Sequence, residues 1–352
     1  MCEISKGEQL NRATLAEKGR IPVYNGGSSP SGYAEESNTA AESVIISEGG
    51  NSCGYVNFIH VPFWRGGHCY LVETDLDKSL LYYVLKANEP QIMSLRVGTG
   101  LPNIQRERLE AFEFDLPTDS TEQRQIVSTC ISIDTHITAL QALIAKYEAI
   151  KKATVNLLLK PRTGWRRGKL ADVCDNFTGL TYAPEDVSDS GTLVLRSSNI
   201  QNEALSFADN VMVACPAPER ATVKTGDLLV CVRNGSRKLI GKSAIITPAA
   251  EGMAFGAFMT ILRATALDQL FLSYLWQSPI IQKQIEESLG ATINQITNAD
   301  IKRFEIYYPT SIKEQHKIAG QIVAIDNVLA AYKAQLGKAQ QLKLGMMSYF
   351  FG

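Results

Sequence analysis

Pro117-Thr-Asp-Ser-Thr-Glu-Gln-Arg-Gln-Ile126 and Pro309-Thr-Ser-Ile-Lys-Glu-Gln-His-Lys-Ile318 are two versions of one stretch of sequence, placed 192 residues apart in a chain of 352 residues. The match continues without a gap over residues 98–151 and 290–343, whereas the segments before each copy differ widely. Internal repeats of this kind decide the class of fold, because each copy is expected to form the same structural unit. The chain is therefore a tandem duplication, in which two similar stretches each follow a segment of different sequence.

A long helix is predicted at each copy of the repeated stretch. Residues 119–158 carry apolar side chains with the four-and-three spacing of a helix that buries one seam, and we extend this seam through Ile150, Thr154 and Leu157. Residues 311–350 show the same spacing. Each helix is predicted to begin with a capping box, in which a polar side chain and a glutamate satisfy the first free N–H groups. The two boxes are Asp119-Ser-Thr-Glu122 and Ser311-Ile-Lys-Glu314, and a proline that ends an apolar strand precedes each.

The composition is that of an ordinary globular protein with room for more than one core, because 45% of the residues are hydrophobic and 20% are charged. The sequence shows neither an uninterrupted apolar stretch of about 20 residues nor a secretion signal, which predicts a cytoplasmic chain without a membrane span. Seven scattered cysteines without a Cys-x-x-Cys pair argue against disulfides and a zinc site. A net charge of −1 means that any DNA-binding surface has to be a local basic patch.

A linker is predicted at residues 160–169, where Pro161 and Gly164 end the first long helix. Before each helix, short apolar runs alternate with turns rich in glycine, serine and asparagine. We therefore predict an α/β (α+β) protein with two α/β domains, separated by a pair of long antiparallel helices in coiled-coil packing and related by a pseudo-twofold internal repeat. The predicted ranges are 1–118 for the first domain, 119–160 for the first helix, 161–310 for the second domain and 311–352 for the second helix.

The first domain is predicted to lack one strand that the second domain has. Residues 2–7 align with residues 174–179, and no earlier residues correspond to residues 165–173. We expect the first domain to be clipped at its amino-terminal end. We also expect the carboxy-terminal end of the chain to return to the neighbourhood of the missing piece.

With these features the chain resembles the specificity subunit of type I restriction-modification systems over essentially its whole length. The residues that carry the resemblance are the twin Pro-Thr-x-x-x-Glu-Gln-x-x-Ile openings of the helices, the turns at residues 98–104 and 290–296, and Trp165-x-x-Gly-Lys-Leu-Ala-Asp-Val173. The resemblance implies that each α/β domain is a target-recognition domain that reads one half of an asymmetric bipartite DNA site. It also implies that the paired helices hold the domains apart.

The resemblance implies partners as well. Double-stranded DNA, two methyltransferase subunits and restriction or translocase subunits are expected to bind, and no membrane. The chain itself is expected to be non-catalytic and to bind no cofactor, with S-adenosylmethionine, ATP and Mg²⁺ held by the partner subunits. Because the first domain is expected to be clipped, the alternative function is that of a truncated or silent subunit that only assembles with methyltransferase subunits. An enzyme that acts on nucleic acid by itself is disfavoured, because the sequence contains no nucleotide loop, metal-ligand set or nuclease cluster.

The predicted helix length gives a spacing for DNA recognition. A helix of about 38 residues is about 57 Å long at about 1.5 Å per residue, and a DNA duplex advances about 3.4 Å per base pair. The helices could therefore span more than one turn of duplex, and the separation of the domains would fix the number of unread bases between the half-sites.

Polar loops in each domain are the candidate DNA-reading elements. Arg233-Asn-Gly-Ser-Arg-Lys238 puts guanidinium groups, an amide and a hydroxyl in a loop that contains glycine, a mixture suited to gripping phosphates and reading base edges. A simple solvated turn is the alternative, and turn chemistry is the alternative for the turns at residues 99–103 and 292–295. The candidate DNA contacts are Tyr24, Asn25, Ser28, Ser29, Ser31, Tyr33, Asn51, Thr99, Asn103, Arg196, Ser197, Ser198, Asn199, Arg233, Asn234, Ser236, Arg237, Lys238, Thr292, Asn294 and Gln295.

Overall fold

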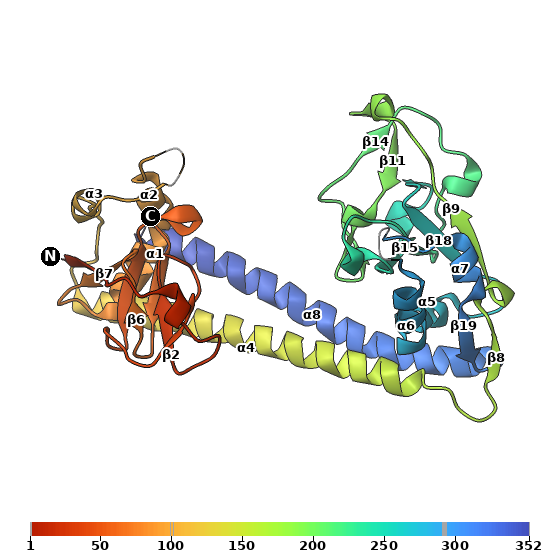
Figure 1. Cartoon of the computed structure of the whole chain (residues 1–352), viewed down its shortest axis with the longest axis horizontal. Helices are drawn as coiled ribbons and strands as arrows, with labels where there is room; N and C mark the ends of the chain where they lie inside the picture. Colours follow the sequence, from red (N-terminus) through yellow and green to blue (C-terminus); the bar gives the residue numbers. More distant parts are fainter. Residues whose placement is uncertain (1, 99, 101, 291–293, 352) are drawn as a thin grey trace. The chain divides into compact units, whose positions relative to one another are not determined.

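Two long helices, α4 (Ser120–Leu158) and α8 (Ile312–Phe351), run through a structure that is otherwise made of short strands and short helices (Figure 1). The structure is a computed structural model, and it describes residues 2–98, 100, 102–290 and 294–351. Unit 1 comprises Met1–Leu143 and Tyr332–Gly352, and unit 2 comprises Ile144–Ala331. Each unit combines one set of strands with a stretch of both long helices, and the mixed α/β class predicted from the sequence is confirmed.

Unit 1 has a four-stranded antiparallel sheet of order β1-β7-β4-β5. The central strand β4 is buried along its whole length, because three of its five residues are Val or Ile and only its two ends are serine. A smaller sheet has the order β3-β2-β6. The strands are β1 (Glu3–Lys6), β2 (Ile21–Tyr24), β3 (Gly32–Ala34), β4 (Ser43–Ser47), β5 (Val56–Ile59), β6 (Trp64–Arg65) and β7 (Cys69–Glu73).

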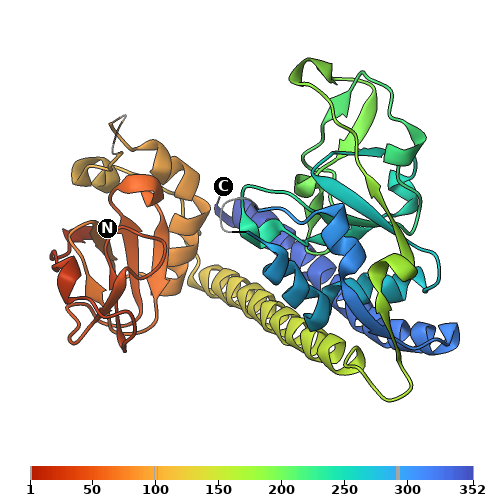
Figure 2. The same cartoon turned by 45° about the vertical axis from the view of Figure 1, so that its right-hand side comes forward.

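Helix α1 (Lys78–Ala87) joins the sheet of unit 1 to its long helices. Asp77 caps the helix by accepting a hydrogen bond from the N–H of Leu80 at 2.9 Å. Leu81 packs into the cluster of the sheet, whereas Leu80 packs with side chains of α4 and α8. Figure 2 shows the helices of unit 1, orange to brown, on one side of its red strands. The other short helices of this unit are α2 (Glu89–Ser94) and α3 (Arg106–Glu110).

Unit 2 is built on an antiparallel sheet of order β16-β15-β18-β9, whose central strand β15 is fully buried. A second sheet has the order β10-β14-β11-β17, and two pairs, β12 with β13 and β19 with β8, complete the unit. The strands are β8 (Arg166–Lys169), β9 (Cys174–Thr178), β10 (Val187–Ser188), β11 (Thr192–Leu195), β12 (Ile200–Gln201), β13 (Ala204–Leu205), β14 (Met212–Val213), β15 (Leu228–Cys231), β16 (Ser243–Ile245), β17 (Ala254–Phe255), β18 (Met259–Ala264) and β19 (Glu305–Tyr308).

Helix α5 (Gln269–Gln277) is the central helix of unit 2. Asp268 caps it by accepting a hydrogen bond from the N–H of Phe271 at 2.8 Å. Trp276 is fully buried, and its indole N–H donates to the carbonyl of Gly241 at 2.8 Å, so the polar atom of this large side chain is satisfied inside the core. The neighbouring helices are α6 (Pro279–Ser288) and α7 (Asn298–Arg303).

Apolar side chains of the two long helices meet within each unit. In unit 1, Ile126 near the start of α4 belongs to one cluster with Met347 and Phe351 near the end of α8. In unit 2, Val155 near the end of α4 belongs to one cluster with Ile322 near the start of α8. The start of one helix therefore lies beside the end of the other within each unit, and the predicted antiparallel pairing is present.

The seam predicted near the end of α4 is wrong. Ile150 and Leu157 are 37% and 68% exposed, whereas Val155 and Leu159 are 4% and 2% exposed. The reason is that this end of α4 packs into the core of unit 2, in one cluster with Leu170 of the α/β domain, as well as along α8. A spacing extrapolated from the earlier turns of the helix cannot anticipate that second contact.

Among the residues that the structure describes, one helix, α4, is long and apolar enough to cross a membrane by length and composition. The core helix of a soluble protein passes the same test, so a single such helix is weak evidence for a membrane span. In this chain α4 contacts α8 through apolar clusters and ion pairs in both units.

A buried tyrosine ties the α/β domain of unit 1 to both long helices. The hydroxyl of Tyr83 donates to the carboxylate of Asp134 on α4 at 3.0 Å, and the ammonium of Lys343 on α8 pairs with the same carboxylate at 2.5 Å. Burial and the neighbouring carboxylate both raise the pKa of Tyr83. The phenol therefore stays protonated and remains a donor.

Unit 2 repeats this contact with the roles of the two helices exchanged. Tyr274 donates to Asp326 on α8 at 2.6 Å, and Lys151 on α4 pairs with Asp326 at 2.6 Å. Asp326 and Lys151 are the repeat equivalents of the aspartate and lysine of unit 1. The two units differ in one respect: Lys151 also pairs with Glu203 at 2.6 Å.

We expect Asp134→Ala to cost more stability than Asp326→Ala. Removing Asp134 leaves the buried Tyr83 hydroxyl and Lys343 without their shared carboxylate, a loss of about 2–3 kcal/mol, whereas Lys151 keeps Glu203 after Asp326→Ala and about 1 kcal/mol less is lost. Urea unfolding, monitored by the hydrogen exchange of backbone amides in each unit, measures how much each substitution lowers the free energy of unfolding. Equal losses would show that Glu203 does not compensate.

Candidate nucleic-acid interface

The first predicted segment of unit 2, residues 196–199, follows the buried end of β11. Asn199 shapes the turn, because its side-chain oxygen accepts a hydrogen bond from the N–H of Arg196 at 2.9 Å. Its amide donates to the carbonyls of Ser206 and Asp209, both at 3.0 Å. Asn199 is fully buried, so its prediction as a DNA contact is wrong, and its role is to order the loop.

The second segment, residues 233–238, follows the buried strand β15 and is largely exposed. Asn234 connects it to the first segment, because its amide donates to the hydroxyl of Ser197 at 3.0 Å. The side-chain oxygen of Asn234 accepts a hydrogen bond from the N–H of Ser236 at 2.9 Å, which closes a local turn. Lys242, which the sequence did not single out, adds a hydrogen bond from Nζ to the carbonyl of Ser197 at 3.4 Å.

The third segment, Asn294 and Gln295, lies against the second. Arg233 and Gln295 are paired in an antiparallel β-bridge. The N–H of Asn234 donates to the carbonyl of Asn294 at 3.3 Å, and the amide of Asn294 donates to the carbonyl of Gly235 at 3.0 Å. Three segments that are distant in sequence therefore form one surface, while Thr292 lies outside the described residues.

The cations of this surface fall into two classes. Arg196 pairs with Asp209 at 3.3 Å, and Arg237 pairs with Glu286 at 3.1 Å. Arg233 and Lys238 have no ion-pair partner within the described part of the chain, and both are exposed. These two side chains are therefore the ones available to phosphate oxygens or base edges.

Phe258 is an aromatic neighbour of Arg233 that the sequence analysis missed. Its side chain is 56% exposed, and the guanidinium carbon of Arg233 lies 4.9 Å from the centroid of its ring. The N–H of Arg233 also donates to the carbonyl of Phe258 at 3.2 Å, which fixes the turn that presents the ring. An exposed aromatic ring beside a cation is a platform for stacking and for orienting the guanidinium plane. The sequence signal was a phenylalanine in a turn that contains Gly256.

The candidate DNA contacts of unit 1 also come from segments that lie next to one another. Gly49 and Asn103 are paired in a β-bridge, and Asn103 is the repeat equivalent of Gln295. The loop after β2 lies next to this bridge, because a Cβ atom added at Gly26 in that loop would be 3.8 Å from the carbonyl oxygen of Gly49. The side-chain oxygen of Asn25 accepts a hydrogen bond from the N–H of His68 at 3.2 Å.

The remaining candidates of unit 1 differ in exposure. Tyr24 is half-buried, with its ring edge-to-face on Phe63 at 5.8 Å, and burial raises its pKa, so it stays a neutral phenol. Tyr33 is half-buried in β3. Thr99 lies outside the described residues. The exposed candidates are Ser28, Ser29, Ser31, Asn51 and Asn103.

The candidate loops of unit 1 lack the cations found on the unit 2 surface. The candidate loops at residues 24–33, 49–51 and 103 contain no lysine or arginine. Glu48 lies beside them and accepts hydrogen bonds from Lys6 at 2.6 Å and from the hydroxyl of Tyr70 at 3.3 Å. Burial and this carboxylate raise the pKa of Tyr70 to about 12. Unit 1 is therefore less suited than unit 2 to binding phosphate.

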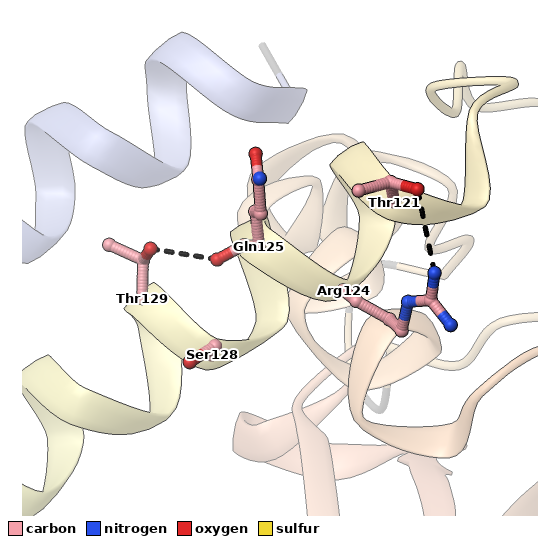
Figure 3. Close-up of a pocket in the computed structure, with 5 residues that line it drawn as sticks. All are labelled: Thr121, Arg124, Gln125, Ser128 and Thr129. Atoms are coloured by element: carbon pink, nitrogen blue, oxygen red, sulfur yellow. Dashed lines mark hydrogen bonds between the residues drawn. The ribbon is translucent and has the colours of Figure 1, made fainter.

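Holding a metal ion or reacting as a nucleophile would require particular groups among the described residues. These residues contain no group of three or more His, Cys, Asp and Glu side chains that could hold a metal ion. Cys231, beneath the unit 2 surface, has its pKa raised to about 11 by burial and is an unreactive thiol at neutral pH. Figure 3 shows an open hollow on α4 that is lined by small polar side chains and Arg124, with Arg124 reaching the hydroxyl of Thr121 at 3.4 Å.

Comparison with known proteins gives a consistent family. Residues 1–151 and 162–341 match the family described as Type I restriction modification DNA specificity domain. A type I specificity subunit of Mycoplasma pneumoniae is 35% identical over 146 residues, which cover 40% of this chain and 39% of that protein. The MjaVIII type I restriction enzyme specificity subunit of Methanocaldococcus jannaschii is 24% identical over 300 residues, which cover 78% of this chain and 69% of that protein. The chain thus spans about two fifths of the length of the first of these relatives.

Solved structures show the same fold. The crystal structure of a type I restriction-modification system S subunit from M. genitalium matches 100% of this chain and 94% of that chain, with a TM-score of 0.68 and 19% identity. A structure concerned with complex assembly and conformational transition of a type I R-M system matches 88% of this chain and 81% of that chain, with a TM-score of 0.57 and 16% identity.

Proposed function

The chain belongs to the Type I restriction modification DNA specificity domain family, and on this premise we propose that it is the DNA-reading subunit of a type I restriction-modification complex in the cytoplasm. Each α/β domain reads one half of a bipartite asymmetric DNA site. The long helices bind two methyltransferase subunits, and restriction subunits join that assembly. This chain is non-catalytic, and the partner subunits hold S-adenosylmethionine, ATP and Mg²⁺.

The observation that carries the proposal is the surface of unit 2 formed by residues 196–198, 233–238 and 294–295. Hydrogen bonds between the segments fix their relative positions, so the polar side chains are preorganised before DNA arrives. Preorganised donors on a rigid scaffold lose little conformational entropy on binding, which favours discrimination between base sequences. Arg233 and Lys238 supply the positive charge that phosphate contacts need.

The two cations have different roles in this proposal. The backbone of Arg233 is held by contacts to Phe258 and Gln295, and its guanidinium carbon lies 4.9 Å from the centroid of the Phe258 ring. The ring orients the guanidinium, which can present two donors to a guanine edge. Lys238 lies in the short 3₁₀ turn Arg237–Leu239, on a flexible side chain, and suits a phosphate contact. Arg233 is therefore assigned to base reading and Lys238 to backbone attraction.

A second candidate function is a subunit that assembles with methyltransferase without reading a complete site. The observation that favours it is the state of unit 1, whose candidate loops contain no lysine or arginine and adjoin Glu48. The two candidates separate when the chain is combined with the methyltransferase subunits and methylated adenines are mapped on genomic DNA. A two-part motif supports the reader, whereas complex formation without sequence-specific methylation supports the assembly role.

We expect Arg233→Ala to weaken binding to the specific DNA site about 10- to 100-fold and to relax specificity at one position, because a bidentate base contact contributes about 1–3 kcal/mol. Lys238→Ala should weaken binding to all sequences alike and reduce the salt dependence by about one phosphate contact. Fluorescence anisotropy at several salt concentrations measures both. Arg220→Ala, an exposed cation of the 3₁₀ turn Glu219–Ala221, is the matched control and should change neither quantity.

A further inference from the structure

Phe258 is an exposed aromatic side chain on a rigid base in unit 2. It lies in the turn between β17 and β18, and the next residue, Met259, is 1% exposed and anchored in the core. The N–H groups of Val232 and Arg233 both donate to the carbonyl of Phe258, at 3.0 and 3.2 Å, and the N–H of Met259 donates to the carbonyl of Gly256 at 2.9 Å. Single exposed apolar side chains are common on protein surfaces. What sets this one apart is its fixed position beside Arg233.

The cation of Arg233 lies over the ring of Phe258, with the guanidinium carbon 4.9 Å from the ring centroid. A DNA base cannot stack on the part of the ring that the cation occupies, which argues against the ring as a simple stacking platform for bases. Phe258 is nevertheless 56% exposed while it makes this contact. The ring can therefore touch a second group at the same time as it orients the guanidinium.

The geometry of duplex DNA indicates where that second group lies. A guanidinium that donates two hydrogen bonds to O6 and N7 of a guanine lies close to the plane of that base. Successive base pairs are stacked about 3.4 Å apart. A ring on which the guanidinium of Arg233 stacks is displaced from the guanine plane by roughly one such step, so it faces the edge of the adjacent base pair.

The four bases differ in what they present to a phenyl ring at that edge of the major groove. Thymine has an apolar 5-methyl group there, whereas the characteristic groups of adenine, guanine and cytosine are hydrogen-bond donors and acceptors. A phenyl ring covers such polar groups without pairing them, which is unfavourable. Covering a methyl group is favourable, because apolar surface is removed from water. The ring therefore favours thymine in the adjacent base pair.

We propose that Phe258 is a specificity-determining residue that contacts the 5-methyl group of a thymine next to the guanine read by Arg233. This proposal rests on the proposed function, because it requires that unit 2 reads DNA through residues 233–238. The two side chains together then read a step of two base pairs. Phe258 supplies apolar recognition to a surface whose other candidate contacts are polar or charged.

The first experiment selects bound duplexes from a pool of random DNA sequences, with the full chain and the methyltransferase subunits. The selected motif should contain a guanine whose preference is lost in Arg233→Ala, with a thymine in the base pair next to it. Phe258→Ala should lose the thymine preference while guanine remains the favoured base. Phe258→Leu keeps an apolar group and should retain part of the preference. Val187→Ala is the matched control, an exposed apolar residue of β10, and should leave the motif unchanged.

The second experiment replaces that thymine with uracil in the selected duplex, which removes only the methyl group. Binding of the natural chain, measured by fluorescence anisotropy, should weaken about fourfold, the loss expected for one methyl-sized apolar group. Phe258→Ala should bind the two duplexes equally. Each ratio is taken within one protein, so a general loss of affinity or stability in the variant does not alter it.

The possible outcomes separate this proposal from the proposed function. The proposal is overturned if no thymine adjoins the guanine, if Arg233→Ala leaves the motif unchanged, or if uracil weakens binding equally in the natural chain and in Phe258→Ala. A sequence is still read in each of these cases, so the proposed function stands. If the pool yields no motif at all, the proposed function fails and this proposal fails with it.

Discussion

Asp227→Ala is expected to lower the free energy of unfolding of unit 2 by about 3 kcal/mol. Asp227 is 2% exposed and receives two hydrogen bonds from Arg263, at 2.7 and 2.6 Å, and one from the N–H of Lys224 at 2.8 Å. Removing one partner of a buried ion pair leaves the other charge without compensation, which typically costs about 3–5 kcal/mol. The lower end applies because the Arg263 side chain is 29% exposed and can regain water.

The measurement is urea unfolding monitored by tryptophan fluorescence in a Trp64→Phe background, in which the remaining tryptophans, Trp165 and Trp276, both lie in unit 2. Glu287→Ala is the control, because this carboxylate forms an exposed pair with Lys283 at 3.6 Å and should contribute less than about 0.5 kcal/mol. A loss below about 1 kcal/mol for Asp227→Ala would contradict the assignment of a buried structural pair.

Replacing residues 161–310 with the second domain of another specificity subunit is expected to change one half of the methylated DNA sequence and to preserve the other half. Methylation at the original sites should fall by about 10³-fold or more, since specific binding exceeds non-specific binding by about 10³–10⁷. The exchange is structurally feasible because both ends of the domain meet. Arg166 lies opposite Tyr308, and the N–H of Leu170 donates to the carbonyl of Phe304 at 2.8 Å.

Mapping of methylated adenines in complexes with the methyltransferase subunits reads out this exchange. The reciprocal exchange of residues 1–118 is the control and should alter only the other half of the motif. If either exchange changes both halves, the two domains do not read independently. If neither changes the motif, the sequence is read elsewhere and the proposed function is wrong.

The parts of the fold that depend on local chemistry could be predicted from the sequence. The polar residues Asp119 and Ser311 and the apolar spacing indicate two long helices, because caps and periodicity are properties of neighbouring residues. Asp119 accepts a hydrogen bond from the N–H of Thr121 at 3.0 Å, and Ser311 accepts one from the N–H of Glu314 at 3.4 Å. The glutamate half of the second predicted capping box is used differently, because Glu314 accepts a hydrogen bond from the indole of Trp165. The burial of Val155 could not be predicted, since it depends on which domain the end of α4 contacts. The Tyr83–Asp134–Lys343 contact joins three distant segments and leaves no local signal.

On the candidate surface of unit 2, local chemistry could again be predicted from the sequence, whereas contacts between distant segments could not. The residue types of the loop at residues 233–238 indicate a recognition element, and the structure joins it to the segments at Ser197 and Asn294. Asn199 carries the same chemistry as the other candidates, but its amide is used within its own loop. Composition gives the type of side chain, whereas only the fold decides whether that side chain is free to bind a ligand.

The division of unit 1 between both ends of the chain has a consequence during synthesis on the ribosome. Leu80 and Ile126 are translated early, but Met347 and Phe351, which cover them, come from the last helix. All of residues 144–331 have to be made in between, which takes about 10–40 s at about 5–20 residues per second. The nascent amino-terminal domain therefore carries an uncovered apolar surface until α8 has been made, and a premature stop codon before or within α8 would leave that surface permanently exposed to chaperones and proteases.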